Sequence, residues 1–225
     1  MSLPRLVAGM FLGLLTVLVA NGAPAQDYPI KTVRIVATQA GGGGDIVSRL
    51  VAQELTRVWG RQVIIDNRSS VIANEFVAKA PPDGYTLLIN SSSLWLWQFM
   101  RSDASWDAMR DFVPIIQTIK QPNILAVHPS LPVKSVKELI ALAKARPGEL
   151  NYATGVVGAT THLASELFNS LAGVKIVGVY YRGTAAALTG LMSGEVQVMF
   201  SNAASVTPHI KSRRLKALAV TTTQP

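Results

Sequence analysis

The chain of 225 residues contains no cysteine, which excludes disulfide bonds, Cys-ligated zinc and a thiol nucleophile. Its formal net charge is +8, but the basic residues are scattered apart from a short cluster at 211–216. A nucleic-acid-binding protein typically has a basic stripe with interleaved aromatic residues, so we expect no nucleic-acid partner. Scattered positive charge is typical of a solvated surface that also helps to collect anionic solutes.

The first 25 residues have the three regions of a signal peptide. Arg5 precedes an apolar run at 6–20, and Ala23-Pro24-Ala25 has the small-x-small pattern of a cleavage site. The run is shorter than the ~20 residues that cross a bilayer, although an uncleaved anchor is the alternative interpretation. We expect cleavage near Ala25, a periplasmic location and no direct membrane insertion of the mature chain.

The first half of the mature chain has a β-α-β-α-β pattern, which is typical of a parallel sheet with helices on its faces. The expected strands are 33–38, 63–65 and 85–89, and the expected helices are 46–59 and 75–80, with a polar turn at 67–70. Trp95, Trp97 and Phe99 follow as a cluster typical of a core or a lid. Two further strands, 111–119 and 124–128, are expected to cross between two lobes.

Four consecutive glycines, Gly41–Gly44, separate the first strand from the first helix. Glycines allow positive φ and a close approach of a partner to the main chain. Asp45 directly precedes the amphipathic segment, so it is predicted to be the helix N-cap, with free N–H groups facing the loop. A strand, a glycine loop and a helix start together form the geometry that binds anions. The sequence therefore predicts one half of a small-anion site here.

The second half repeats the pattern. Ser135 and Glu138 form a capping box at the start of a helix that Pro147-Gly148 ends. The later strands are expected at 150–153, 174–179, 195–200 and 215–220, and the helices at 162–171, 184–192 and 203–211. Thr154–Thr161 is a second loop rich in glycine and threonine, and it is the predicted other half of the site.

Motifs for catalysis and cofactor binding are missing from the sequence. The glycine run fails the dinucleotide fingerprint at its third glycine, and neither a phosphate-binding loop nor a nucleophile elbow is present. His128, His162 and His209 do not have a metal-ligand spacing. We expect no metal, no cofactor and no catalytic residue. His162 has two open roles, packing at a helix start or direct contact with a ligand.

Backbone N–H groups and hydroxyls remain as the chemistry of the two loops. Such groups bind a carboxylate through charge-assisted hydrogen bonds, directly or through water. Either loop alone is also consistent with an ordinary tight connection, whereas the two together favour a binding site. The predicted ligand-binding residues are Thr38, Gly41, Gly42, Gly43, Ser91, Ser92, Thr154, Gly155, Gly158, Thr160, Thr161 and His162.

The whole mature chain resembles the Bug receptors, the periplasmic solute-binding proteins of tripartite tricarboxylate transporters. The resemblance is carried by Gly41-Gly42-x-x-Asp45 with Arg49, Asn67-Arg68, 77–88, Asp111-Phe112, His128-Pro129-Ser130, 147–153, His162-Leu163, Glu166-Leu167-Phe168, Tyr181-Arg182-Gly183 and 215–221. It implies a two-lobed α/β fold, the type 2 periplasmic binding protein fold. It also implies a monomer that binds a small carboxylate between its lobes and delivers it to membrane transport subunits.

The resemblance also implies how the lobes divide. Lobe 1 is expected at 26–120, and lobe 2 with the start of the return strand at 121–225. Members of the family return to lobe 1 after a strand like 215–221, so we expect lobe 1 to be incomplete at its C-terminus, with exposed apolar surface, as in a truncated product. Two alternatives to a transport receptor remain open: a cleft enzyme (hydrolase or transferase) with His162 as its base, and a ligand-sensing domain for a membrane signalling partner.

Overall fold

A computed structural model describes residues 27–38, 40–101 and 104–222. The predicted signal peptide, 1–25, lies outside these residues, as does Gln39. The chain divides into a short unit, 1–30, and a compact unit, 31–225, to which all the helices and strands described below belong.

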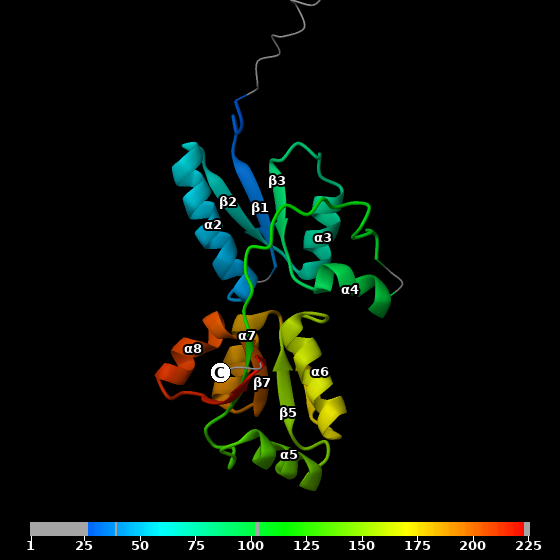
Figure 1. The fold of residues 1–225 in the computed structure, drawn as a ribbon, viewed down its shortest axis with the longest axis vertical. Helices are drawn as coiled ribbons and strands as arrows, with labels where there is room; N and C mark the ends of the chain where they lie inside the picture. Colours follow the sequence, from blue (N-terminus) through cyan, green and yellow to red (C-terminus); the bar gives the residue numbers. More distant parts are fainter. Residues whose placement is uncertain (1–26, 39, 102–103, 223–225) are drawn as a thin grey trace, which may run out of the picture. The chain divides into compact units, whose positions relative to one another are not determined.

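The first sheet contains three parallel strands in the order β2-β1-β3. The strands are β1 (Val33–Ala37), β2 (Val63–Asn67) and β3 (Thr86–Ile89), and the helices that follow them are α2 (Gly43–Trp59), α3 (Ser70–Ala78) and α4 (Ser93–Met100). α2 packs on β1 and β2, and α3 packs on β3 (Figure 1). The predicted parallel β-α-β-α-β order is confirmed, although α3 lies earlier in the chain than predicted.

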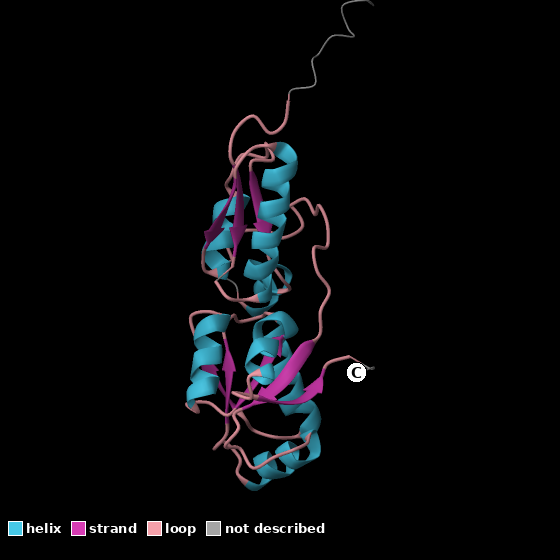
Figure 2. Cartoon of the chain, turned by 90° about the vertical axis from the view of Figure 1, so that its left-hand side faces the viewer, coloured by secondary structure: helices cyan, strands magenta, loops and turns pink. Residues whose placement is uncertain are grey.

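The second sheet contains five strands in the order β6-β5-β7-β4-β8. Its strands are β4 (Asn123–Val127), β5 (Asn151–Thr154), β6 (Val177–Tyr180), β7 (Val198–Asn202) and β8 (Lys216–Val220). Its helices are α5 (Val136–Ala145), α6 (Thr160–Ala172), α7 (Thr184–Ser193) and α8 (Ala203–Lys211), and helices flank the strands in Figure 2. β5 is parallel to β6 and β7, whereas β4 is antiparallel to β7 and β8.

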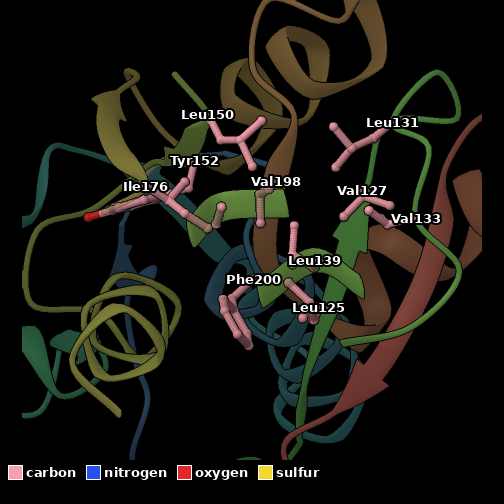
Figure 3. Close-up of a cluster of buried hydrophobic side chains, with 11 residues drawn as sticks. Leu125, Val127, Leu131, Val133, Leu139, Leu150, Tyr152, Ile176, Val198 and Phe200 are labelled. Carbon is pink, nitrogen blue, oxygen red and sulfur yellow. The ribbon is translucent and has the colours of Figure 1, made fainter. Parts of the chain in front are cut away.

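Alternating residues of the second sheet build two separate cores, as the two-residue period of a strand requires. Leu125, Tyr152, Val198 and Phe200 face the cluster that contains Leu139 of α5 (Figure 3). Their neighbours form the opposite cluster against α7 and α8, with the members Ala126, Ala153, Ala187, Leu188, Leu191, Val196, Met199, Val206 and Leu215. Burial on both faces explains why these strands are almost continuously apolar.

The strand predicted at 111–119 is wrong. These residues have no regular secondary structure, and the side chains of Val113, Ile115 and Ile116 are exposed by 87%, 77% and 78%. A strand needs a neighbour to satisfy its backbone groups, and Pro114 has no N–H to donate to one. The described residues place no strand beside this segment. The exposed side chains confirm the expected apolar surface in the part of the chain assigned to lobe 1; the lobe boundary at residue 120 stays a prediction.

Replacing Leu139 with alanine is expected to lower the free energy of unfolding by about 2–5 kcal/mol, because its fully buried side chain would leave a cavity in the α5 core. The matched control is Leu171→Ala on α6, where the leucine is 79% exposed and the change should stay within about 0.5 kcal/mol. Urea unfolding measures both, and equal losses would contradict the assignment of this core.

Candidate functional site

Six helices in the described part of the chain begin at the carboxyl ends of parallel strands. β1, β2 and β3 lead into α2, α3 and α4, and β5, β6 and β7 lead into α6, α7 and α8. Because the strands of each set run in the same direction, the first turns of their three helices lie at one edge of their sheet. In α/β sheets, that edge is where ligands bind.

None of these six helices has a side-chain hydrogen bond at its described N-cap. The N-cap residues are Gly42, Ser69, Ser92, Ala159, Gly183 and Asn202. α5, which follows the antiparallel strand β4, differs: the side chain of Ser135 accepts a hydrogen bond from the backbone N–H of Glu138, as predicted. In α4, the backbone N–H groups of Leu94 and Trp95 bond to the carbonyls of Ser91 and Ser92. The first turns of the other five helices have no N-cap side chain as acceptor among the described residues. Each helix dipole adds positive potential at these starts.

Asp45 is not the N-cap of α2, and that prediction is wrong. The helix begins at Gly43, three residues earlier than predicted, with Gly42 as N-cap, because glycine can occupy the first turn without a side-chain clash. Asp45 instead lies in the first turn and accepts the N–H of Gly41 at 3.1 Å and the side-chain amide of Asn67 at 2.9 Å. Arg49 pairs with the same carboxylate at 3.1 Å. Asp45 therefore holds the backbone of the first loop in place at Gly41.

The pKa of Asp45 reflects these contacts. Burial alone would raise it, but the hydrogen bonds from Asn67, Gly41 and Arg49 outweigh burial and hold the pKa below its ordinary value. Asp45 is therefore ionised at neutral pH, and Arg49 balances its charge. The first turns of α3, α4, α6, α7 and α8 contain no acidic residue.

The first loop contacts residues that follow strands of the other sheet. Gly41 has a φ of +81°, and its carbonyl accepts the hydroxyl of Ser205 on α8 at 3.0 Å. A Cβ on Gly41 would lie 2.8 Å from the Cβ of Ala185 on α7. Gly43 is buried and faces the side-chain amides of Gln121 and Asn202. Glycine is required here by both conformation and space.

The second loop repeats this arrangement. Gly158 has a φ of +76°, and its carbonyl accepts the hydroxyl of Ser92 at 2.9 Å. Gly155 packs directly on the backbone of Gly183 and Thr184, at the start of α7. Gly41 of the first loop and Gly155 of the second loop therefore both pack against the start of α7. Ser92 contacts the second loop.

The hydroxyl-bearing residues of the prediction differ in exposure. Thr160 and Ser91 are exposed, Thr38 is half-buried, and Thr161 is buried. Thr154 is fully buried, and its Oγ1 has no hydrogen-bond partner among the described residues. A buried hydroxyl without a partner costs about 1–3 kcal/mol, so a ligand or water that bonds to it would recover that energy.

His162 lies near the start of α6 and has two partners. Its Nδ1 accepts the N–H of Gly158 at 3.3 Å, and its Nε2 lies 3.5 Å from the hydroxyl of Tyr180. Burial lowers the pKa of His162, and the Glu166 carboxylate opposes this only in part, so the imidazole is neutral. These contacts are the packing role expected at a helix start. Direct contact with a ligand stays a prediction.

Sequence reasoning missed three polar residues at these loops, Gln121, Asn202 and Ser205, whereas Asn67 belongs to the polar turn expected at 67–70. Asn67 donates to the carbonyl of Thr38 at 2.8 Å as well as to Asp45. Asn202 and Ser205 follow β7 just as Thr160 follows β5, so the rule that located the second loop also indicates them. Gln121 carries no such signal in the sequence.

No group of three or more His, Cys, Asp or Glu side chains in the described ranges could hold a metal ion. Within the same ranges, no helix combines the length and the apolarity needed to cross a membrane.

Comparison with known proteins identifies the family. Residues 47–225 match the sequence model described as the tripartite tricarboxylate transporter family receptor, TctC. The chain belongs to this family. It is 34% identical to Protein BugT of Bordetella pertussis over 226 residues, which cover 98% of this chain and 69% of BugT.

Solved structures confirm the predicted α/β fold of periplasmic binding proteins. A Rhodopseudomonas palustris protein, Rpa4515 with adipate, is 36% identical with a TM-score of 0.81 and covers 87% of this chain and 67% of that one. MatC from the same organism with bound malate is 26% identical with a TM-score of 0.78, over 87% and 68% of the two chains. The chain therefore spans about two thirds of the length of these relatives.

Replacing Gly155 with alanine is expected to lower the free energy of unfolding by about 1–3 kcal/mol, because the new Cβ would overlap the backbone of Gly183 and Thr184. The matched control is Gly44→Ala in α2, whose Cβ would only reach Thr38 Oγ1 at 3.7 Å. Alanine should leave stability there unchanged or raise it by up to about 1 kcal/mol. Urea unfolding measures both, and a neutral Gly155→Ala would contradict the close packing of these loops.

Proposed function

We propose that this protein is a periplasmic receptor that binds a small organic carboxylate where the loops of its two sheets meet. The observation that carries the proposal is the contrast in helix capping. All six helices that start at the carboxyl edges lack a side-chain cap, whereas α5, which follows the antiparallel strand, has one. Uncapped first turns offer N–H groups and positive potential, which favour an anion.

The glycine content of the loops supports recognition through the main chain. Gly41–Gly43 and Gly155 have no side chains that could shield the backbone N–H groups of the first turns. A hydrogen bond to a charged acceptor contributes about 1.5–3 kcal/mol, so two or three such bonds suffice for a useful affinity. The proposed additional donors are Thr161 and Thr154, whose hydroxyl has no hydrogen-bond partner in the described part of the chain.

The two relatives with bound ligands support a carboxylate among the small anions. One was solved with adipate and the other with malate, both of which are dicarboxylates. The proposed ligand-binding residues of this chain remain those of the two loops, Thr38–Gly43 and Thr154–His162, with Ser91 and Ser92 beside them. The proposed transport partners are the membrane subunits of a tripartite tricarboxylate transporter, as the family description suggests.

We place no reaction at this site. The groups around the loops are amides, hydroxyls, the ion-paired Asp45 and Arg49, and one histidine. Both ring nitrogens of that histidine lie near partners. A general base must be able to accept a proton from a substrate. If an activity screen found turnover in the unaltered protein and His162→Ala abolished it, the alternative of a hydrolase or transferase with His162 as its base would be supported instead.

Replacing Gly42 with valine tests the proposal. The φ of −84° and ψ of 166° at Gly42 are extended values that valine adopts, so the protein should fold while the side chain blocks access to the first turn of α2. We expect the affinity for adipate, or for malate if adipate does not bind, to fall by at least about tenfold, the equivalent of one charge-assisted hydrogen bond.

Isothermal titration calorimetry measures this affinity, with circular dichroism as the check of folding. The matched control is Thr189→Val, an isosteric change on an exposed part of α7, which should bind as the unaltered protein does. A neutral diamide of adipate should not bind. Unchanged adipate affinity in Gly42→Val would contradict this location of the site.

A further inference from the structure

The starts of α2 and α6 share the same backbone geometry. In each helix, the third residue sends its side chain back to the glycine that precedes the N-cap. Asp45 accepts the N–H of Gly41 at 3.1 Å, and His162 accepts the N–H of Gly158 at 3.3 Å. Both glycines have positive φ, +81° and +76°. The two sheets thus present the same backbone turn, held by two different side chains.

The carbonyl of each of these glycines accepts a hydrogen bond from a serine that belongs to the other sheet's set of helices. Ser205 on α8 donates its hydroxyl to Gly41, and Ser92 at the start of α4 donates its hydroxyl to Gly158, at 3.0 and 2.9 Å. We call each pair of serine hydroxyl and glycine carbonyl a latch. The peptide units around the glycine carry both the latch and the bond to the helix side chain, so that side chain orients the latch.

We propose that Asp45 and His162 are equivalent positioning residues for the two latches, and that protonation of His162 opens the Ser92–Gly158 latch while the Ser205–Gly41 latch stays closed. The proposal rests on the proposed function, because each latch holds one of the two loops that would bind the ligand. Acid would then weaken retention of the ligand through the loop that contains Gly158, and not through the loop that contains Gly41.

The chemistry of the two side chains explains the difference. A carboxylate such as Asp45 accepts hydrogen bonds as long as it is ionised, and Asn67 and Arg49 help to keep it so. Nδ1 of His162 accepts the Gly158 N–H only while it carries no proton. A protonated imidazole has donors at both nitrogens, so two N–H groups would then face each other. Its positive charge would also lie at the positive end of the α6 dipole.

The groups around His162 determine the direction of the effect. Tyr180 on β6 faces Nε2, and Glu166 is one turn further along α6, where Tyr152 on β5 donates its hydroxyl to it. Ser93 and Met100 of α4, both uncharged, lie beside Gly158. Burial is the largest influence on His162 and lowers its pKa from 6.5, with Glu166 opposing.

The sign of the pH dependence follows from that lowered pKa. Above 6.5, the histidine is neutral in both the folded and the unfolded chain, and its full contribution to stability is present. As the pH falls below 6.5, the unfolded chain takes up the proton first, and this contribution declines until the folded-state pKa is passed. The latch therefore opens on the acid side of 6.5.

The test measures amide hydrogen exchange of Gly158 and Gly41 by nuclear magnetic resonance in the ligand-free full chain. The pH is lowered from about 8 to about 4, across the range in which histidine titrates. We expect the protection of Gly158 to fall by about tenfold or more while that of Gly41 changes by less than about threefold. Imidazole ¹⁵N shifts of His162 in the same samples report its protonation, and circular dichroism confirms that the fold persists.

The matched variant is His162→Asn, which keeps an acceptor oxygen near the place of Nδ1 but does not titrate. It should retain the protection of Gly158 at every pH, whereas Ser92→Ala should lose the latch at every pH. Protonation of His162 without any change at Gly158 would overturn the proposal. So would the same pH dependence in His162→Asn.

A second readout separates this proposal from the proposed function. In the unaltered protein, bound adipate should dissociate faster in acid, and His162→Asn should remove that acceleration. If adipate does not bind at about pH 8 but Gly158 still responds to acid, the carboxylate assignment fails and the latch stands. If adipate binds and Gly158 does not respond, the latch fails and the binding site stands.

Discussion

The first turn of an α-helix leaves four backbone N–H groups without acceptors in the helix, and this constraint organises the candidate site. In α5, the Ser135 side chain provides one acceptor. In the six helices that follow parallel strands, no N-cap side chain does so within the described structure. The parallel order of β1–β3 and of β5–β7 collects these first turns at the sheet edges. The order of strands and helices along the chain therefore determines both the sheet topology and the place where the uncapped first turns gather.

Glycine makes the close contacts of each loop with neighbouring helix starts possible. Gly41 and Gly158 adopt positive φ so that their N–H groups turn toward Asp45 and His162 while their carbonyls face Ser205 and Ser92. A side chain at Gly155 would instead collide with the backbone at the start of α7. The absence of side chains at these positions is what lets other groups come close to the main chain.

Local patterns were sufficient to predict most of the fold. The strand expected at 124–128 is observed at Asn123–Val127, and α8 has the predicted bounds, Ala203–Lys211. Prediction failed where the answer depends on distant residues. The segment 111–119 has strand-forming side chains but no strand beside it among the described residues. The latches join residues 164 and 66 positions apart, and no local pattern indicates such a pairing.

The most direct test of the central claim is a map of amide shift changes when adipate, or malate, is titrated into the ¹⁵N-labelled protein. If uncapped first turns bind the carboxylate, the largest changes should occur at the amides of Gly42 and Gly43 in α2 and of Thr160 and Thr161 in α6. The capped first turn of α5, with Ser135 and Glu138, is the internal reference and should not change. Saturable changes centred on α5, or on surfaces away from both loops, would contradict the account.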